Sequence, residues 1–102
     1  MVIESAEVLT HEGEDRQGRL TLKALAPGFR LEGPLRLGWR VWDEERQAYG
    51  TPYGFDGVQS LELRLATPPD RVVVNYQAKM PNSPRFRLDF FLVSRSGIEH
   101  RL

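Results

Sequence analysis

The sequence predicts an all-β fold, an antiparallel sandwich of two sheets with about seven or eight strands. Three observations predict it. Hydrophobic and polar residues alternate at a period of two, turn-forming residues separate the alternating segments about every ten residues, and no long window has apolar residues at helical spacing. A small closed β-barrel is the alternative, because periodicity does not report whether a sheet closes on itself.

The first two strands are expected to form a hairpin. Alternation predicts one strand over Val2–Leu9 and another over Arg19–Leu25, with the polar segment His11–Gly18 as the turn between them. The tripeptide Ala26–Gly28 then breaks the run, because Pro removes a backbone donor and Gly favours turns. The next strand must therefore start after this break.

The clearest strand is LRLGWRVW, Leu35–Trp42. Successive side chains of a strand point to opposite faces of the sheet. One face is apolar and forms the expected core: Leu35, Leu37, Trp39 and Val41. The other face holds two arginines and the second tryptophan: Arg36, Arg40 and Trp42. We therefore expect Trp39 to be buried and Trp42 to face outward.

The rest of the chain continues this pattern. The Gly-rich loop Asp43–Gly57 has room for brief pairing at Gln47–Tyr49, and two prolines within Thr67–Asp70 separate the strands on either side. The remaining alternating segments predict four strands, over 61–65, 72–78, 85–93 and 98–102. This pattern resembles that of Ig-like and fibronectin-like modules, a fold analogy without functional weight. Residues 1–102 are expected to form a single domain, because a chain of this length builds one core.

Composition restricts the possible functions. The chain has 14 basic and 14 acidic residues and no Cys, so it lacks a strong net field, disulfides and thiolate chemistry. The N-terminus has no basic segment followed by an apolar run, and no run approaches the length of about 20 residues that spans a bilayer. We therefore expect a cytoplasmic protein with no membrane association.

Catalytic and metal-binding residues are sparse. The two histidines, His11 and His100, lie in polar surroundings, and no serine has the context of a catalytic nucleophile. The acidic turn His11–Asp15 and the cluster Asp43–Glu45 do not match the spacing of a calcium loop. We therefore expect no enzyme activity, no bound metal and no cofactor.

Aromatic residues mark the candidate binding site. Five of the chain's ten aromatic residues lie between Gly38 and Gly57, and Asp43 and Asp56 could add hydrogen bonds there. Strand 85–93 adds an outward arginine and an outward ring if it neighbours the Trp42 strand. The candidate site residues are Arg40, Trp42, Tyr49, Tyr53, Phe55, Arg87 and Phe91.

Three functions compete. The first is a non-enzymatic protein-interaction or assembly domain, such as a subunit of a complex, a virion structural protein or a regulator. Its partner would be another protein or a second copy, and we expect a homo-oligomer. The first alternative is a carbohydrate- or small-ligand-binding module that uses the aromatic segment 39–57. The second is single-stranded nucleic-acid binding by the arginine and aromatic faces, which the neutral net charge disfavours.

Overall fold

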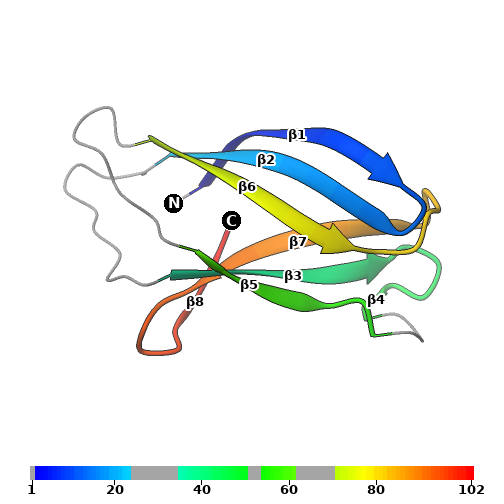
Figure 1. Ribbon diagram of the computed structural model, residues 1–102. Coiled ribbons are helices and arrows are strands. Elements are labelled where there is room, and N and C mark those ends of the chain that lie inside the picture. The colour runs from blue at the N-terminus through cyan, green and yellow to red at the C-terminus, as the bar shows by residue number, and fades with distance from the viewer. Residues whose placement is uncertain (1, 24–34, 51–53, 62–70) are drawn as a thin grey trace.

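The chain folds into two facing antiparallel β-sheets (Figure 1). The computed structural model describes residues 2–23, 35–50, 54–61 and 71–102. The upper sheet has the order β1-β2-β6, with bounds Val2–Glu12, Asp15–Lys23 and Arg71–Lys79. The lower sheet has the order β4-β3-β7-β8, and β5 also pairs with β3. Its strands are β3 (Leu35–Asp43), β4 (Ala48–Tyr49), β5 (Gly57–Leu61), β7 (Phe86–Val93) and β8 (Glu99–Arg101). The predicted all-β class with two antiparallel sheets is confirmed.

The first hairpin differs from its prediction. The segment His11–Gly18 is not a long turn, because β1 continues to Glu12 and β2 starts at Asp15. Gly13 adopts a φ of 57°, which allows a tight connection between the two strands. Polar residues extend the strands here because this end of the hairpin is exposed and is held by backbone pairing, so it needs little apolar surface.

Three predicted segments lie wholly or partly outside the described residues. These are the break Ala26–Gly28, the end of the second strand, and the strand after Leu61 together with its prolines. Among the described residues, no helix is long and apolar enough to cross a membrane.

The core lies between the two sheets. Leu20 and Leu22 of β2 face the lower sheet and are fully buried. Trp39 is 9% exposed and belongs to the same cluster, so its predicted burial is confirmed. The other buried members come from β3, β6 and β7: Leu37, Val72, Val74, Tyr76, Ala78 and Leu92. Each large side chain buried in this way contributes about 1.5–3 kcal/mol.

Aromatic rings of the core pack directly on glycines of the neighbouring strand. Trp39 is paired with Gly57, where an added Cβ would lie 2.5 Å from the ring atom Cζ2. Tyr76 covers Gly18 in the same way, and the two residues are also direct partners. A side chain at either glycine would displace a core ring, so these positions need the close approach that only glycine allows.

The two long sides of the sandwich differ. On one side, Gln59 of β5 bridges to the edge of β6: it accepts from the Gln77 N–H at 3.0 Å and donates to the Asn75 carbonyl at 3.4 Å. On the other side, β1 lies opposite β7, and the two strands run in opposite directions (Figure 1). A cleft of about 310 Å³ opens there between the sheets.

Candidate functional site

The structure gathers most of the predicted site residues on one surface. This surface is the side of the lower sheet that faces away from the core, here called the outer face. Five candidates lie on it, from three different strands: Arg40, Trp42, Tyr49, Arg87 and Phe91. Trp42 is paired with both Tyr49 and Arg87 in the strand register, which is why residues far apart in sequence meet.

The two loop candidates do not join this group. Tyr53 lies outside the described residues. Phe55 is half-buried, and its carbonyl oxygen accepts the Trp39 indole N–H at 3.1 Å. The backbone of Phe55 therefore positions a core residue.

Trp42, Tyr49 and Arg87 form the centre of the outer face. The rings of Trp42 and Tyr49 meet edge to face, with centroids 4.8 Å apart and planes at 71°. The guanidinium of Arg87 lies 5.4 Å from the centroid of Trp42. Edge-to-face rings and cation–π contacts are both attractive, so the three side chains support one another.

The carboxylate of Asp89 holds Tyr49 and Arg87 of this cluster in place. Arg87 binds its carboxylate through Nε at 2.8 Å, and the Tyr49 hydroxyl donates to it at 2.7 Å. Glu44 provides a second carboxylate to Arg87, at 3.1 Å. The hydrogen bond from Arg87 lowers the pKa of Asp89, and the bond to Asp89 raises the pKa of Tyr49. At neutral pH the network is therefore ionised at Asp89 and protonated at Tyr49.

Phe91 lies on the outer face but is covered. Its ring rests on Gly38, where an added Cβ would lie 2.2 Å from the ring, and the guanidinium of Arg40 stacks 4.2 Å above it. Phe91 is consequently only 7% exposed. The prediction that it offers a free ring is wrong, because the missing side chain at Gly38 lets the ring sink toward the backbone. Phe91 instead supports Arg40, which also binds Glu99 of β8 at 2.7 Å.

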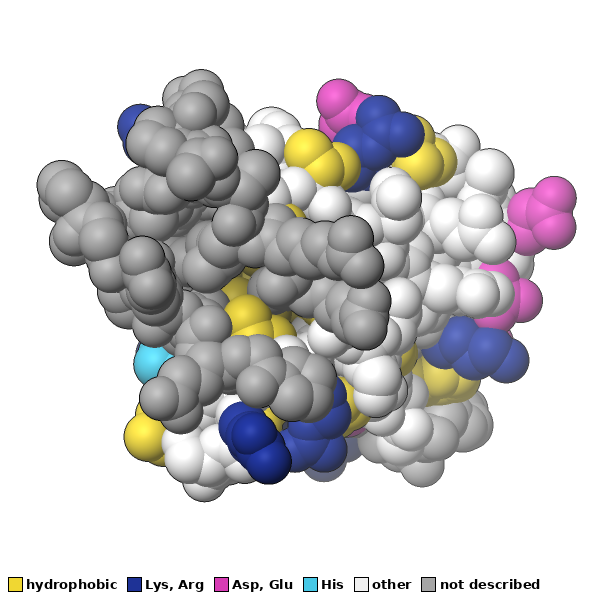
Figure 2. Space-filling model, turned by 60° about the vertical axis from the view of Figure 1, so that its left-hand side comes forward, with side chains coloured by type: hydrophobic (Ala, Val, Ile, Leu, Met, Phe, Trp, Pro, Cys, Tyr) yellow, Lys and Arg dark blue, Asp and Glu magenta, His cyan; other side chains and the backbone are white. Residues whose placement is uncertain are grey.

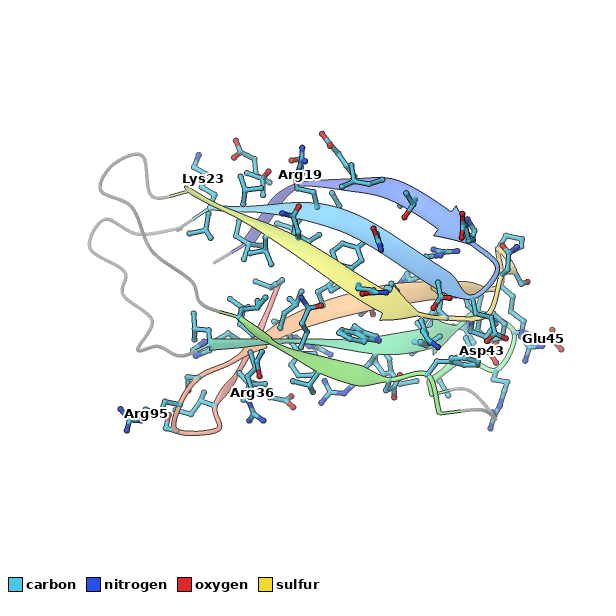
Figure 3. All side chains as sticks on the ribbon, viewed as in Figure 1. Arg19, Lys23, Arg36, Asp43, Glu45 and Arg95 are labelled. Atoms are coloured by element: carbon cyan, nitrogen blue, oxygen red, sulfur yellow. The ribbon has the colours of Figure 1, made fainter. Side chains whose placement is uncertain are left out.

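The outer face also carries two arginines beyond these ion pairs. Arg36 and Arg101 point to this side, and neither makes a hydrogen bond or ion pair with a described residue, although the charge of Arg101 helps to lower the pKa of Asp89. Figure 3 shows Arg36 and Arg95 at the end of the lower sheet away from Asp43. Basic side chains also gather at the lower margin of Figure 2, on the side of this sheet. The arginines at the aromatic centre are paired with carboxylates, and Arg36 and Arg101 add positive charge around these pairs.

Asp43 is not available to a ligand, and Asp56 uses one of its oxygens to bind β3. Asp43 is fully buried, and Arg85 binds both of its oxygens, at 2.6 and 2.7 Å. This ion pair lowers the pKa of Asp43 to about 2. Asp56 is exposed and accepts the Val41 N–H at 2.6 Å through one oxygen. The predicted role of Asp43 as a ligand contact is wrong because Asp43 is buried in its ion pair, whereas that role of Asp56 stays a prediction.

The shape of the surface limits what it can bind. A depression beside Arg40, Tyr49 and Arg101 measures about 30 Å³, whereas small-molecule sites usually measure about 300–1,000 Å³. A larger groove, of about 420 Å³, lies on the β5–β6 side and is lined by Trp39, Val58, Gln59, Gln77, Ala78 and Lys79. The outer face is thus shallow at Arg40, whereas the cleft of about 310 Å³ between the sheets reaches its margin at Tyr49 and Asp89.

Sequence reasoning missed Glu99 and Arg101 of the short strand β8. Both side chains lie on the outer face because the register of β8 against β7 pairs Glu99 with Val93 and Arg101 with Phe91. Alternation in Ile98–Leu102 was too short a signal to assign them.

Comparison of the chain with protein-family models, with curated proteins and with solved structures finds no match.

Proposed function

We propose that this chain is a non-enzymatic protein-interaction or assembly domain that binds its partner through the outer face of the lower sheet. The observation that carries the proposal is the cluster of Trp42, Tyr49 and Arg87. Tryptophan, tyrosine and arginine are the residue types that dominate binding energy at protein interfaces. The ion pairs of Arg87 with Asp89 and Glu44 hold the cluster in one arrangement, so less side-chain entropy is lost on binding.

The shallow surface at Arg40 also favours a protein partner over a small molecule. Tyr49 is 44% exposed, the depression at Arg40 is too small for a drug-sized ligand, and the cleft that Tyr49 also borders is at the lower end of the size range of small-molecule sites. Arg36 and Arg101 flank the cluster without an ion pair to a described residue, which favours a partner surface that carries carboxylates. Nucleic acid is a weaker alternative, because Glu44, Asp89 and Glu99 neutralise much of the positive charge on this face.

Affinity capture with matched baits tests the proposal. The baits are the wild-type chain, a Trp42→Ala/Tyr49→Ala double variant, and a Val73→Asp control on the outer side of β6, where Val73 is 58% exposed. We expect a protein that is captured by the wild type and the control but lost from the double variant. A protein captured equally by all three baits would mean that the outer face is not the binding surface.

A small-ligand or carbohydrate site is the second candidate, and the groove of about 420 Å³ beside Trp39 favours it. That volume is within the range of small-molecule sites. A panel of glycans can be tested with the Trp42→Phe variant, in which Trp39 is the only tryptophan. A saturable change in its fluorescence would support this candidate, and an unchanged spectrum across the panel would count against it.

The finer assignments are also proposals. An Ig-like or fibronectin-like arrangement is supported by short antiparallel strands in two sheets. A cytoplasmic location is supported by the absence of Cys.

A further inference from the structure

The open side of the sandwich exposes apolar residues that belong to the inner surface. Val8 of β1 is paired with Gly18, which lies beneath the core ring of Tyr76, so Val8 points toward the core side of the upper sheet. It is nevertheless 59% exposed. Across the opening, Leu88 and Phe90 of β7 are only half-buried and line the cleft of about 310 Å³ together with Ile3 and Leu102.

The backbone of β7 is also unpaired along part of this side. Strand β8 pairs with Phe91–Val93, and the Leu102 N–H donates to the Phe90 carbonyl at 3.3 Å. Because alternate residues of a strand point their backbone groups the same way, the N–H and C=O of Leu88 face the same edge. In the described residues no strand pairs with β7 at this position on that side. Both β1 and the first half of β7 therefore offer free edges to one opening.

The charges of the two edges are complementary. Strand β1 carries Glu4, Glu7 and Glu12 and no Lys or Arg, although Glu7 forms an exposed ion pair with Arg19 of β2 at 3.8 Å. Exposed pairs of this kind are weak, so two β1 edges would still repel each other. On the facing side, Arg87 is neutralised by Asp89 and Glu44, and Glu99 by Arg40. Arg101 has no ion pair with a described residue, although its charge acts on Asp89 and helps to lower the pKa of that carboxyl. It also lines the cleft.

We propose that two copies of this chain associate through this open side, with β1 of each copy added beside the β7–β8 edge of the other. In this dimer a twofold axis runs parallel to the strands. Its rotation places the lower sheet of one copy level with the upper sheet of the other, so these two sheets continue into each other across the interface. Since β1 and β7 run in opposite directions, the new pairing is antiparallel (Figure 1).

This arrangement gives favourable contacts on both the core side and the solvent side of the joined sheets. On the core side, Val8 of one copy meets Leu88 and Phe90 of the other, which removes apolar surface from water. On the solvent side, the glutamates of β1 approach Arg101 of the partner. The symmetric contact closes on itself, which gives a dimer and not a filament. The cleft borders the outer-face cluster at Tyr49 and Asp89. Val8, Leu88 and Phe90 are not part of that cluster, so the inference does not rest on the proposed function.

Molar mass measured by light scattering over a range of concentrations, up to high micromolar, tests the proposal. We expect a reversible wild-type dimer. Val8→Asp should weaken association by about tenfold or more, because it places a carboxylate in the apolar contact. Val73→Asp is the matched control, since Val73 is 58% exposed but lies on the other side of the upper sheet, and it should leave the association unchanged. Circular dichroism verifies that each variant is folded.

Charge exchange tests the pairing itself. Arg101→Glu should weaken the dimer, and adding Glu4→Arg and Glu7→Arg to that variant should restore it. A wild-type chain that stays monomeric at high micromolar concentration would overturn the proposal. So would a dimer that Val8→Asp and Val73→Asp affect equally, or one that the reversed charges of β1 fail to restore.

Discussion

The two faces of β3 are held together by different forces. Trp39, on the inner face, packs on Gly57 and donates one hydrogen bond, to the Phe55 carbonyl. Trp42, three residues later on the outer face, contacts Tyr49 and Arg87 in a network of charged side chains. The inner contacts stabilise the fold by removing apolar surface from water, which happens only in the folded chain. The outer contacts are polar and partly exposed, so they add little to folding but remain available to a partner.

The largest effect is expected from the inner tryptophan. Trp39→Ala should reduce the free energy of unfolding by about 3–5 kcal/mol, because it leaves a large cavity in the core and frees the Phe55 carbonyl. That is a large part of the stability of a domain of this size. Urea denaturation measures it, with Trp39→Phe as a control that keeps a ring on Gly57. A loss below about 1 kcal/mol would mean that Trp39 is not a core residue.

A second test uses acid, which separates the buried carboxylate from the exposed one. Asp43 has a folded pKa of about 2 against an ordinary value of 3.8, so its ion pair with Arg85 stabilises the fold above that ordinary value. This contribution should be lost as the pH falls from 3.8 toward 2. Melting temperatures across this window should fall less steeply for Asp43→Asn, which has no such proton to bind.

Asp89→Asn is the comparison on the outer face. The pKa of Asp89 is also lowered, chiefly by Arg87, but the Asp89 side chain is 33% exposed. Solvent weakens such an ion pair, so Asp89→Asn should change the acid profile less than Asp43→Asn. A larger change for Asp89→Asn would reverse the assignment of the two faces.

The smallest effect on stability is expected from the outer tryptophan. Trp42→Ala should cost about 1 kcal/mol, because Trp42 is only half-buried and its partners stay solvated. Urea denaturation beside Trp39→Ala provides the measurement. If the two variants lose equal stability, the outer face is part of the folding core and the division between the faces is wrong.

Much of the fold could be predicted because period-two alternation reports directly which side chains share a face. Val72, Val74, Tyr76 and Ala78 are all buried, as their spacing in β6 indicates. The same rule assigned Trp39 and Trp42 to opposite faces. It failed for His11–Gly18, because the polar residues at the exposed end of a hairpin look like those of a turn.

The remaining features depend on pairings between distant residues, which alternation does not contain. The ion pair of Asp43 with Arg85 joins residues 42 positions apart. Phe91 is covered because Gly38 is its register partner, and the sequence shows only a glycine within a strand. Such a glycine signals the close approach of another group, but it does not name the group. The site could therefore be predicted as a set of residue types, but not as a geometry.

Acrylamide quenching of single-tryptophan variants tests most directly whether the two faces of β3 have separate roles. Trp39→Phe leaves only Trp42, and Trp42→Phe leaves only Trp39, which is 9% exposed. We predict clearly stronger quenching of Trp42 than of Trp39 in the folded state, and equal quenching of both after unfolding in urea. Equally weak quenching of both tryptophans in the folded state would mean that Trp42 is closed off from solvent, and the outer face would then lose its role as a binding surface.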